Sequence, residues 1–190
     1  MYNRIIGVIL ALGSVVFVLL LAGVGSAMLT DDPPEVSPYA SDATTTTATS
    51  GTARFVLSTV AFGDAGYVEI TNVGTGAGTL DGHWLCQFPS YGQISGSLGP
   101  GESARFDGAG TGFGDMLAAG GEIGLYTSSG FGDPGAIIAY VEWGESGHER
   151  SGTATEAGVW TADSAVDAAG ASLILTVEEA PTSAEGWAIG

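Results

Sequence analysis

Residues 66–85 read GYVEITNVGTGAGTLDGHWL and combine an alternating segment with a glycine-rich turn. In the first part, Val68 and Ile70 fall on one side of the chain, while Glu69 and Thr71 fall on the other. This period of two residues is typical of a β-strand that is buried on one face only. Three glycines then break the chain before the next apolar run. The sequence therefore predicts two consecutive strands joined by a turn.

The composition extends this prediction to the rest of the globular part. The chain has 190 residues, 32 glycines and only 13% charged residues. Its length allows one domain of ordinary size with tails. Many short strands joined by glycine-rich turns produce such a composition, whereas a helical bundle does not. We therefore expect an all-β domain.

Apolar segments separated by turn signals mark the strands. We expect these strands at residues 54–61, 67–72, 82–88, 103–106, 122–127, 136–143 and 171–178. Turns that contain proline and glycine lie at 98–102 and 131–135. The remaining connections are expected to be a mobile loop at 107–114, a short helical turn at 115–119 and a polar loop at 144–158. About seven short strands with such turns predict an antiparallel β-sandwich.

The chain is strongly acidic. It has 21 acidic residues against four arginines and no lysine, which gives a formal net charge of −17. Such a charge repels phosphate backbones, so we expect no nucleic-acid partner. The acids are dispersed along the sequence, which favours a solvated acidic surface that keeps the protein soluble. A salt-rich habitat also fits, because salt screens the repulsion between the acids.

An apolar segment near the N-terminus predicts export. Residues 5–29 form an uncharged run of 25 residues, which is long enough to cross a bilayer. Arg4 precedes this run, and Asp31, Asp32 and Glu35 follow it. This distribution places the N-terminus in the cytoplasm and everything after about residue 30 outside. We expect a protein that is either secreted or anchored at the cell surface.

The fate of the apolar segment is open. Gly25 and Ala27 form an acceptable signal-peptidase site, but the run is long for a cleaved signal peptide. Residues 1–29 are therefore a signal peptide or a membrane anchor, and the chain contacts the membrane through residues 5–29 if it is not cleaved. Residues 30–52 are rich in threonine and proline and predict a disordered linker, either bare or glycosylated.

The predicted organisation is completed by a β-sandwich domain at residues 53–180 and a C-terminal tail at 181–190. Four short motifs follow one another in this domain, namely Glu69-Ile70-Thr71-Asn72, Leu80-Asp81-Gly82-His83-Trp84-Leu85, Leu98-Gly99-Pro100-Gly101-Glu102 and Tyr140-Val141-Glu142-Trp143. Their order resembles that of the lamin tail domain, and the resemblance spans about residues 54–178. His83 lengthens the second motif by one residue relative to the common spacing of the family. The resemblance implies an immunoglobulin-like β-sandwich and a non-enzymatic module of exported proteins.

Cys86 is the only cysteine, so neither an intramolecular disulfide nor a metal site built on cysteines can form. It lies in an apolar run, where we expect a buried and unreactive thiol. The alternative is a disulfide with a second chain.

No other residues form a strong catalytic or metal-binding motif. His148 lies among polar residues at 145–150, where a metal site or a Ser–His pair is conceivable, but a solvated turn explains the pattern better. Asp107 and Asp115 flank a glycine-rich loop without the spacing of a calcium-binding loop. We therefore expect no enzyme and predict no catalytic, metal-binding or cofactor-binding residues.

The expected positions of the four tryptophans bear on the remaining hypotheses about function. We expect Trp84 and Trp143 in the core and Trp187 exposed in the tail. The favoured function is an interaction module that contacts a protein or another envelope component, or a second copy of itself. The alternative is a carbohydrate-binding module that uses Trp160 or Trp187, with calcium-assisted binding or a hydrolase as weaker options.

Overall fold

The structure is a computed structural model, and it describes residues 51–63, 65–170, 172–176 and 179–190. The expected signal peptide or anchor at 1–29 and nearly all of the expected linker at 30–52 lie outside these residues. Within the described part of the chain, no helix is long and apolar enough to span a membrane.

Short strands make up most of the regular structure. The described strands are β1 (Phe55–Ala61), β2 (Tyr67–Asn72), β3 (Gly78–Thr79), β4 (Trp84–Gln87), β5 (Ser90–Gln93), β6 (Ser97–Leu98), β7 (Ser103–Asp107), β8 (Gly121–Tyr126), β9 (Ile137–Trp143), β10 (Leu173–Leu175) and β11 (Trp187–Ile189). Helices are few and short, namely α1 (Gly108–Thr111), α2 (Ser151–Glu156) and the 3-10 helix η1 (Ala184–Gly186).

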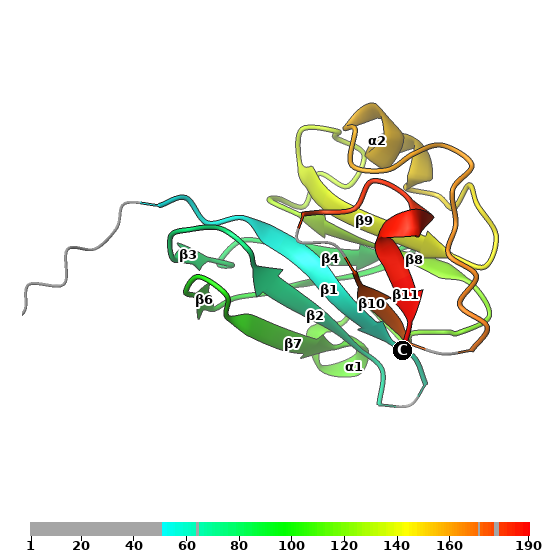
Figure 1. Cartoon of the computed structure of the whole chain (residues 1–190), viewed down its shortest axis with the longest axis horizontal. Coiled ribbons are helices and arrows are strands. Elements are labelled where there is room, and N and C mark those ends of the chain that lie inside the picture. The colour runs from blue at the N-terminus through cyan, green and yellow to red at the C-terminus, as the bar shows by residue number, and fades with distance from the viewer. Residues whose placement is uncertain (1–50, 64, 171, 177–178) are drawn as a thin grey trace, which may run out of the picture. The chain divides into compact units, whose positions relative to one another are not determined.

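The strands form two main antiparallel sheets. The first sheet has the order β11-β10-β1-β2-β7, and the second has the order β5-β4-β8-β9. A small third sheet pairs β3 with β6. Figure 1 shows β1, β2 and β10 of the first sheet in front of β4, β8 and β9 of the second. One cluster of buried apolar side chains draws on both main sheets, so the expected all-β architecture with antiparallel sheets is confirmed.

The alternation in β2 explains why this strand anchors the core. Val68 and Ile70 are fully buried between the sheets, as the sequence predicts. In the register, Val68 lies opposite Val60 of β1 and Phe106 of β7. Each fully buried aliphatic side chain of this kind stabilises the fold by about 1.5–3 kcal/mol relative to an exposed one.

Asn72 closes the turn after β2 with its side chain, as expected for asparagine. Its Oδ1 accepts hydrogen bonds from the backbone N–H groups of Arg54 and Gly74, both at 3.0 Å. Its Nδ2 donates to the carbonyl groups of Gly76 (2.8 Å) and Leu98 (3.0 Å). The fully buried amide therefore satisfies four backbone groups and joins the residue before β1, the turn after β2 and β6.

Trp143 at the end of β9 is fully buried, which confirms its expected place in the core. Its indole Nε1 donates to the carbonyl of Leu117 at 2.9 Å, and its ring centroid lies 5.2 Å from that of Phe62. Trp84 differs from the expectation. It is only partly buried, because its position in β4 turns it away from the space between the sheets.

Several predicted connections are wrong. Residues 115–119 form no helical turn; instead Met116 makes an isolated bridge with Gly63. The helix of this region is α1, where the side chain of Asp107 accepts a hydrogen bond from the backbone N–H of Gly110. Gly112 ends α1 in the left-handed region at φ 98°, which glycine adopts without strain. The predicted loops at 107–114 and 144–158 therefore contain α1 and α2.

Part of the expected C-terminal tail at 181–190 belongs to the first sheet. Within it, β11 pairs with β10, and Trp187 lies opposite Leu175. The Trp187 side chain is only 7% exposed, so it is part of the core cluster. The strand expected at 171–178 is described only as the shorter β10, and residues 171, 177 and 178 lie outside the described part.

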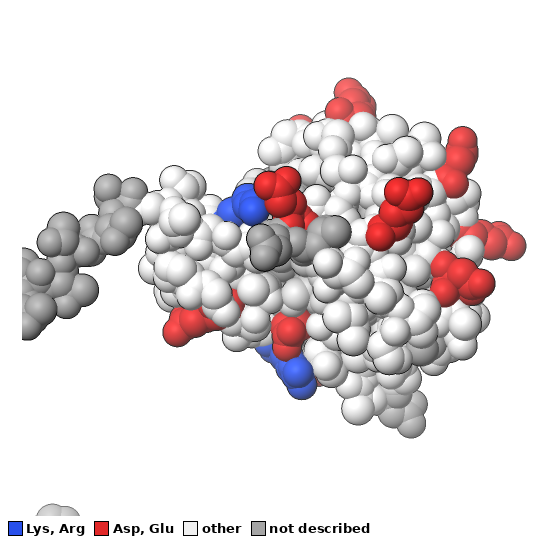
Figure 2. Space-filling view, viewed as in Figure 1, with Lys and Arg blue, Asp and Glu red and all other residues white. Residues whose placement is uncertain are grey.

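The acidic surface that the composition predicts is visible in Figure 2. Acidic side chains are scattered over the face shown, with few basic ones among them. Glu122 and Glu142 are exceptions, because they are 3% and 0% exposed. A buried carboxylate requires compensating hydrogen bonds, and these two residues lead to the candidate site.

Candidate interaction site

The second sheet turns one face toward the core and the other away from it. In its register, Cys86 and Tyr140 lie opposite Gly124, and Glu142 lies opposite Glu122. Because successive side chains of a strand alternate between the two faces, these residues share one face. We call it the outer face. It carries a polar cluster toward β9 and aromatic rings toward β5.

Glu142 fastens the chain segment after β9 to the outer face. Its Oε2 accepts hydrogen bonds from the backbone N–H groups of Gly147 (3.1 Å) and His148 (3.0 Å). Its Oε1 accepts from the hydroxyl of Ser151 (2.9 Å) and the indole N–H of Trp160 (3.1 Å). One buried carboxylate thus holds the loop, the first turn of α2 and the chain beyond α2 on the sheet.

Tyr140 connects Glu142 to Glu122. Its hydroxyl lies 2.7 Å from Oε2 of Glu122 and 3.2 Å from Oε2 of Glu142. The backbone N–H of Arg150 also donates to Oε2 of Glu122 at 2.9 Å. Burial raises the pKa of Glu122 against the opposing effect of these hydrogen bonds, and the charge of Glu142 adds to the rise. Burial and the two glutamates raise the pKa of Tyr140, so its hydroxyl remains a neutral donor.

These contacts give the polar cluster a structural role. The ring Nε2 of His148 lies 3.3 Å from the carbonyl of Trp143, while Ser146 is exposed in the same loop. In the described part of the chain, no hydrogen bond joins Ser146 to His148, and no group of three or more His, Cys, Asp or Glu side chains is placed to hold a metal ion. Residues 145–150 therefore form a polar turn that is attached to two buried carboxylates.

Cys86 lies on the same face and is 1% exposed, so the expected burial of this thiol is confirmed. Burial raises its pKa to about 11, against a lowering effect of Arg150. A thiol with so high a pKa is a poor nucleophile, because the reactive species is the thiolate. The guanidinium of Arg150 lies over the ring of Phe88, 5.0 Å from its centroid. Arg150 thus contacts Phe88 with its side chain and Glu122 of the polar cluster with its backbone N–H.

Three aromatic side chains are in contact on the part of the outer face near β5. The ring centroid of Tyr91 lies 4.9 Å from that of Phe131 and 6.0 Å from that of Trp84. Tyr91 is 53% exposed, whereas Trp84 and Phe131 are half-buried. We call Trp84, Tyr91 and Phe131 the aromatic surface. Tyr126, which is fully buried, supports Phe131 at 5.2 Å from beneath.

The rings of the aromatic surface are not coplanar. Tyr91 is tilted by 40° against Phe131 and by 59° against Trp84. A flat stacking platform for a sugar needs rings that present their faces in one direction, so this arrangement does not favour one. Trp160 and Trp187, which the sequence suggests for carbohydrate binding, are only 2% and 7% exposed, so neither presents its ring on the surface.

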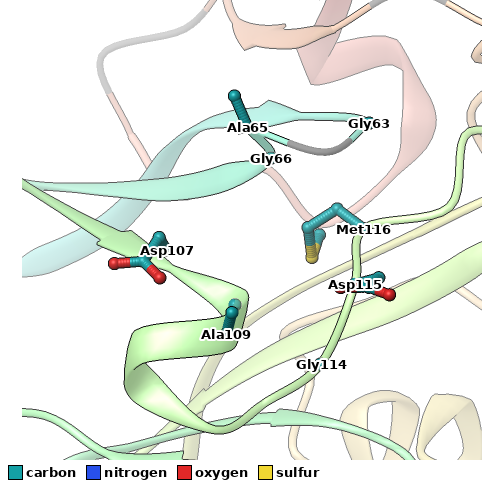
Figure 3. A pocket seen from close by; sticks show the side chains of 9 residues that line it. Gly63, Ala65, Gly66, Asp107, Ala109, Gly114, Asp115 and Met116 are labelled. Atoms are coloured by element: carbon teal, nitrogen blue, oxygen red, sulfur yellow. The ribbon is translucent and has the colours of Figure 1, made fainter. Parts of the chain in front are cut away.

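Asp107 and Asp115, which the sequence suggests for calcium, do line one pocket. It has a volume of about 240 Å³, and it lies between the turn after β1, the start of α1 and the segment that follows α1. Figure 3 shows the two aspartates on separate segments across this pocket. The Asp107 carboxylate already caps α1, which leaves the pocket without a convergent set of oxygen ligands.

We compared the chain with protein-family models, curated proteins and solved structures, and found no match. The resemblance to the lamin tail domain therefore stays a prediction, which rests on the ordered motifs between residues 69 and 143.

Sequence reasoning missed most of this site. The signal for the polar cluster is present, because Glu142 is the single charged residue in the otherwise apolar β9. A lone acid in the most apolar strand of a domain needs partners, and the Glu-Ser-Gly-His segment at 145–148 supplies two of them, the backbone N–H groups of Gly147 and His148. The aromatic surface gives a weaker signal, since Tyr91 and Phe131 lie in turn-rich segments far apart in the sequence.

Proposed function

We propose that this chain is an exported, non-enzymatic interaction module. In this proposal it has an immunoglobulin-like β-sandwich of the lamin-tail type and binds another protein or envelope component through the aromatic surface. The export part rests on the apolar run at 5–29 and on the charges on either side of it. The binding part rests on one observation, which is the exposure of Tyr91 within a cluster of aromatic rings.

Exposed aromatic rings held in fixed positions are typical of binding sites. Tyrosine and tryptophan are enriched among the residues that dominate binding energy at protein interfaces, because they bury a large area with few rotatable bonds. Here the rings are supported by the buried Tyr126 and by the paired strands β4 and β5. The surface is therefore arranged before a partner arrives, which lowers the entropic cost of binding.

Protein is the favoured partner because of the ring geometry. Rings tilted by 40–76° form a faceted surface into which side chains of a partner can pack. Binding of a glycan through the same rings is the second candidate, supported by the half-buried Trp84 among them.

The test uses three forms of the full-length chain in an uncharged detergent, namely the parent, Tyr91→Ala and Ile174→Ala. It compares the proteins that each form captures from an extract of the source cell's envelope. We expect Tyr91→Ala to lose a captured protein that the parent retains. Ile174→Ala is the matched control, because Ile174 is 43% exposed on β10 of the other main sheet. Equal capture by all three proteins would refute the proposal. Loss of capture after periodate treatment of the extract would place the glycan candidate first.

A further inference from the structure

We propose that the aromatic surface binds a basic segment of a partner protein and that an arginine of this segment stacks on Tyr91 and Phe131. This inference rests on the proposed function and names the chemistry of the partner. It is carried by the geometry of the rings, by the exposed Asp133 two residues after Phe131 and by the way this fold holds Arg105.

The charge of the chain selects a cationic partner. With a net charge of −17 and no lysine, the protein attracts basic segments and repels anionic ones, including a second copy of itself. An acid also follows the aromatic surface in the sequence. Asp133 is exposed two residues after Phe131, and its Oδ1 accepts a hydrogen bond from the backbone N–H of Gly135 at 2.8 Å.

The rings supply the second attraction. A cation over the face of an aromatic ring is favoured by the ring's quadrupole, and the planar guanidinium of arginine also stacks on the ring. Tyr91 is more than half exposed and turns toward solvent from the edge strand β5, so its ring is accessible to a partner.

The first sheet shows the same binding chemistry within the fold. Arg105 lies 4.4 Å from the centroid of the Tyr67 ring, and its Nε donates to Oε2 of Glu69 at 2.7 Å. The guanidinium of Arg105 on β7 is thus held by a ring and a carboxylate that both belong to the neighbouring strand β2. At the second sheet, Phe131 and Asp133 come from the loop between β8 and β9, and Tyr91 comes from the edge strand β5. Exposed Tyr91 and exposed Asp133 therefore provide a ring and a carboxylate to an arginine from outside.

The experiment measures binding of defined peptides to the full-length chain in an uncharged detergent by titration calorimetry. The probes are a peptide of alternating glycine and arginine and matched peptides with lysine or glutamate in place of arginine. We expect the arginine peptide to bind most tightly, the lysine peptide more weakly and the glutamate peptide not at all. Rising salt should weaken both cationic peptides, because it screens the charges.

Variants separate stacking from general charge attraction. Tyr91→Ile keeps an apolar residue suited to a strand but removes the ring. It should lower the affinity for the arginine peptide about tenfold. Asp133→Asn should lower the affinity for the arginine peptide a fewfold while the ring stays in place. This second variant keeps the test valid if Tyr91→Ile disturbs β5. Ile174→Ala should leave binding unchanged.

Three outcomes would overturn the inference. Equal binding of the arginine and lysine peptides, unaffected by Tyr91→Ile and Asp133→Asn, would show charge attraction without a site. Binding of a neutral oligosaccharide that Tyr91→Ile abolishes, with no peptide binding, would assign the rings to a glycan. A dimer that Tyr91→Ile dissociates would assign them to a second copy. If capture from the envelope extract depends on Tyr91 but no basic peptide binds, only the present inference fails and the proposed function stands.

Discussion

Glu142 shows how much one side chain can contribute to this fold. It is fully buried and accepts hydrogen bonds from two backbone N–H groups, a serine hydroxyl, an indole and a tyrosine hydroxyl. Leaving a buried hydrogen-bonding group unsatisfied costs about 1–3 kcal/mol, and more where a charge is involved.

We therefore expect Glu142→Gln to destabilise the domain. The amide nitrogen of glutamine would face either the N–H groups of Gly147 and His148 or the indole N–H of Trp160, so donors would oppose donors. The free energy of unfolding in urea should fall by about 2–4 kcal/mol. Glu145→Gln removes an exposed acid from the same loop and should change it by less than about 0.5 kcal/mol. Equal stability of the two variants would contradict this account of Glu142.

Glu122 predicts an unusual pH dependence. Its pKa is raised in the folded protein, so the native state holds the proton more tightly than the unfolded state. The stabilising contribution is therefore fully present below the unfolded pKa of about 4.3 and is lost as the pH rises through the folded pKa. Glu122→Gln removes this dependence and keeps the shape of the side chain. We expect the parent to gain stability relative to Glu122→Gln as the pH falls through this window; a constant difference in unfolding free energy would contradict the raised pKa.

At the scale of whole elements, apolar–polar alternation and apolar runs predicted most strands. Strands whose sequences show neither pattern were missed. The strict alternation of β2 gave its bounds correctly, and the apolar run of β9 gave its position to within one residue. β5 was missed because the segment Ser90-Tyr91-Gly92-Gln93 has only one residue of high strand propensity. Its pairing with β4, rather than its own sequence, places it in the sheet.

Parts of the candidate site were missed for the same reason, because pairing and contacts between segments place them. Helix α2 reads Ser-Gly-Thr-Ala-Thr-Glu, which is a weak helix sequence, and Glu142 accepts a hydrogen bond from Ser151 in its first turn. Tyr91 and Phe131 meet only because β5, β4 and β8 are neighbours in the sheet. Contacts between distant segments leave no local periodicity from which they could be predicted.

Tryptophan substitutions test how much buried side chains of different strands contribute to stability. Trp143 is fully buried in β9, and Trp143→Ala should lower the unfolding free energy by about 3–5 kcal/mol. Trp187 is also buried but lies in the edge strand β11, which can open locally, so Trp187→Ala should cost less. It should nevertheless increase hydrogen exchange in β10 and β11. Parent-like exchange and stability in Trp187→Ala would contradict the place of this side chain in the core.

At the scale of the whole molecule, the charge and the N-terminal sequence determine the expected surroundings of the domain. The acidic surface favours cationic partners. In the proposed orientation, the charges around residues 5–29 direct the rest of the chain outward. A reporter enzyme fused behind residue 50 should therefore be active outside the cytoplasm. Replacing the acids at 31, 32 and 35 by lysine should reduce its export, whereas a reporter confined to the cytoplasm in the parent would contradict the proposed orientation.

The central claim is that the exposed aromatic rings of the outer face contact a protein partner in the cell. The most direct measurement is site-specific photo-crosslinking of the full-length chain, with a photoreactive phenylalanine analogue in place of Tyr91. The matched position is Ile174, which is similarly exposed on the first sheet. We predict a discrete, protease-sensitive adduct from position 91 that is absent from position 174 and weakened by a basic arginine peptide. Identical adducts from both positions, or none from position 91, would contradict the claim.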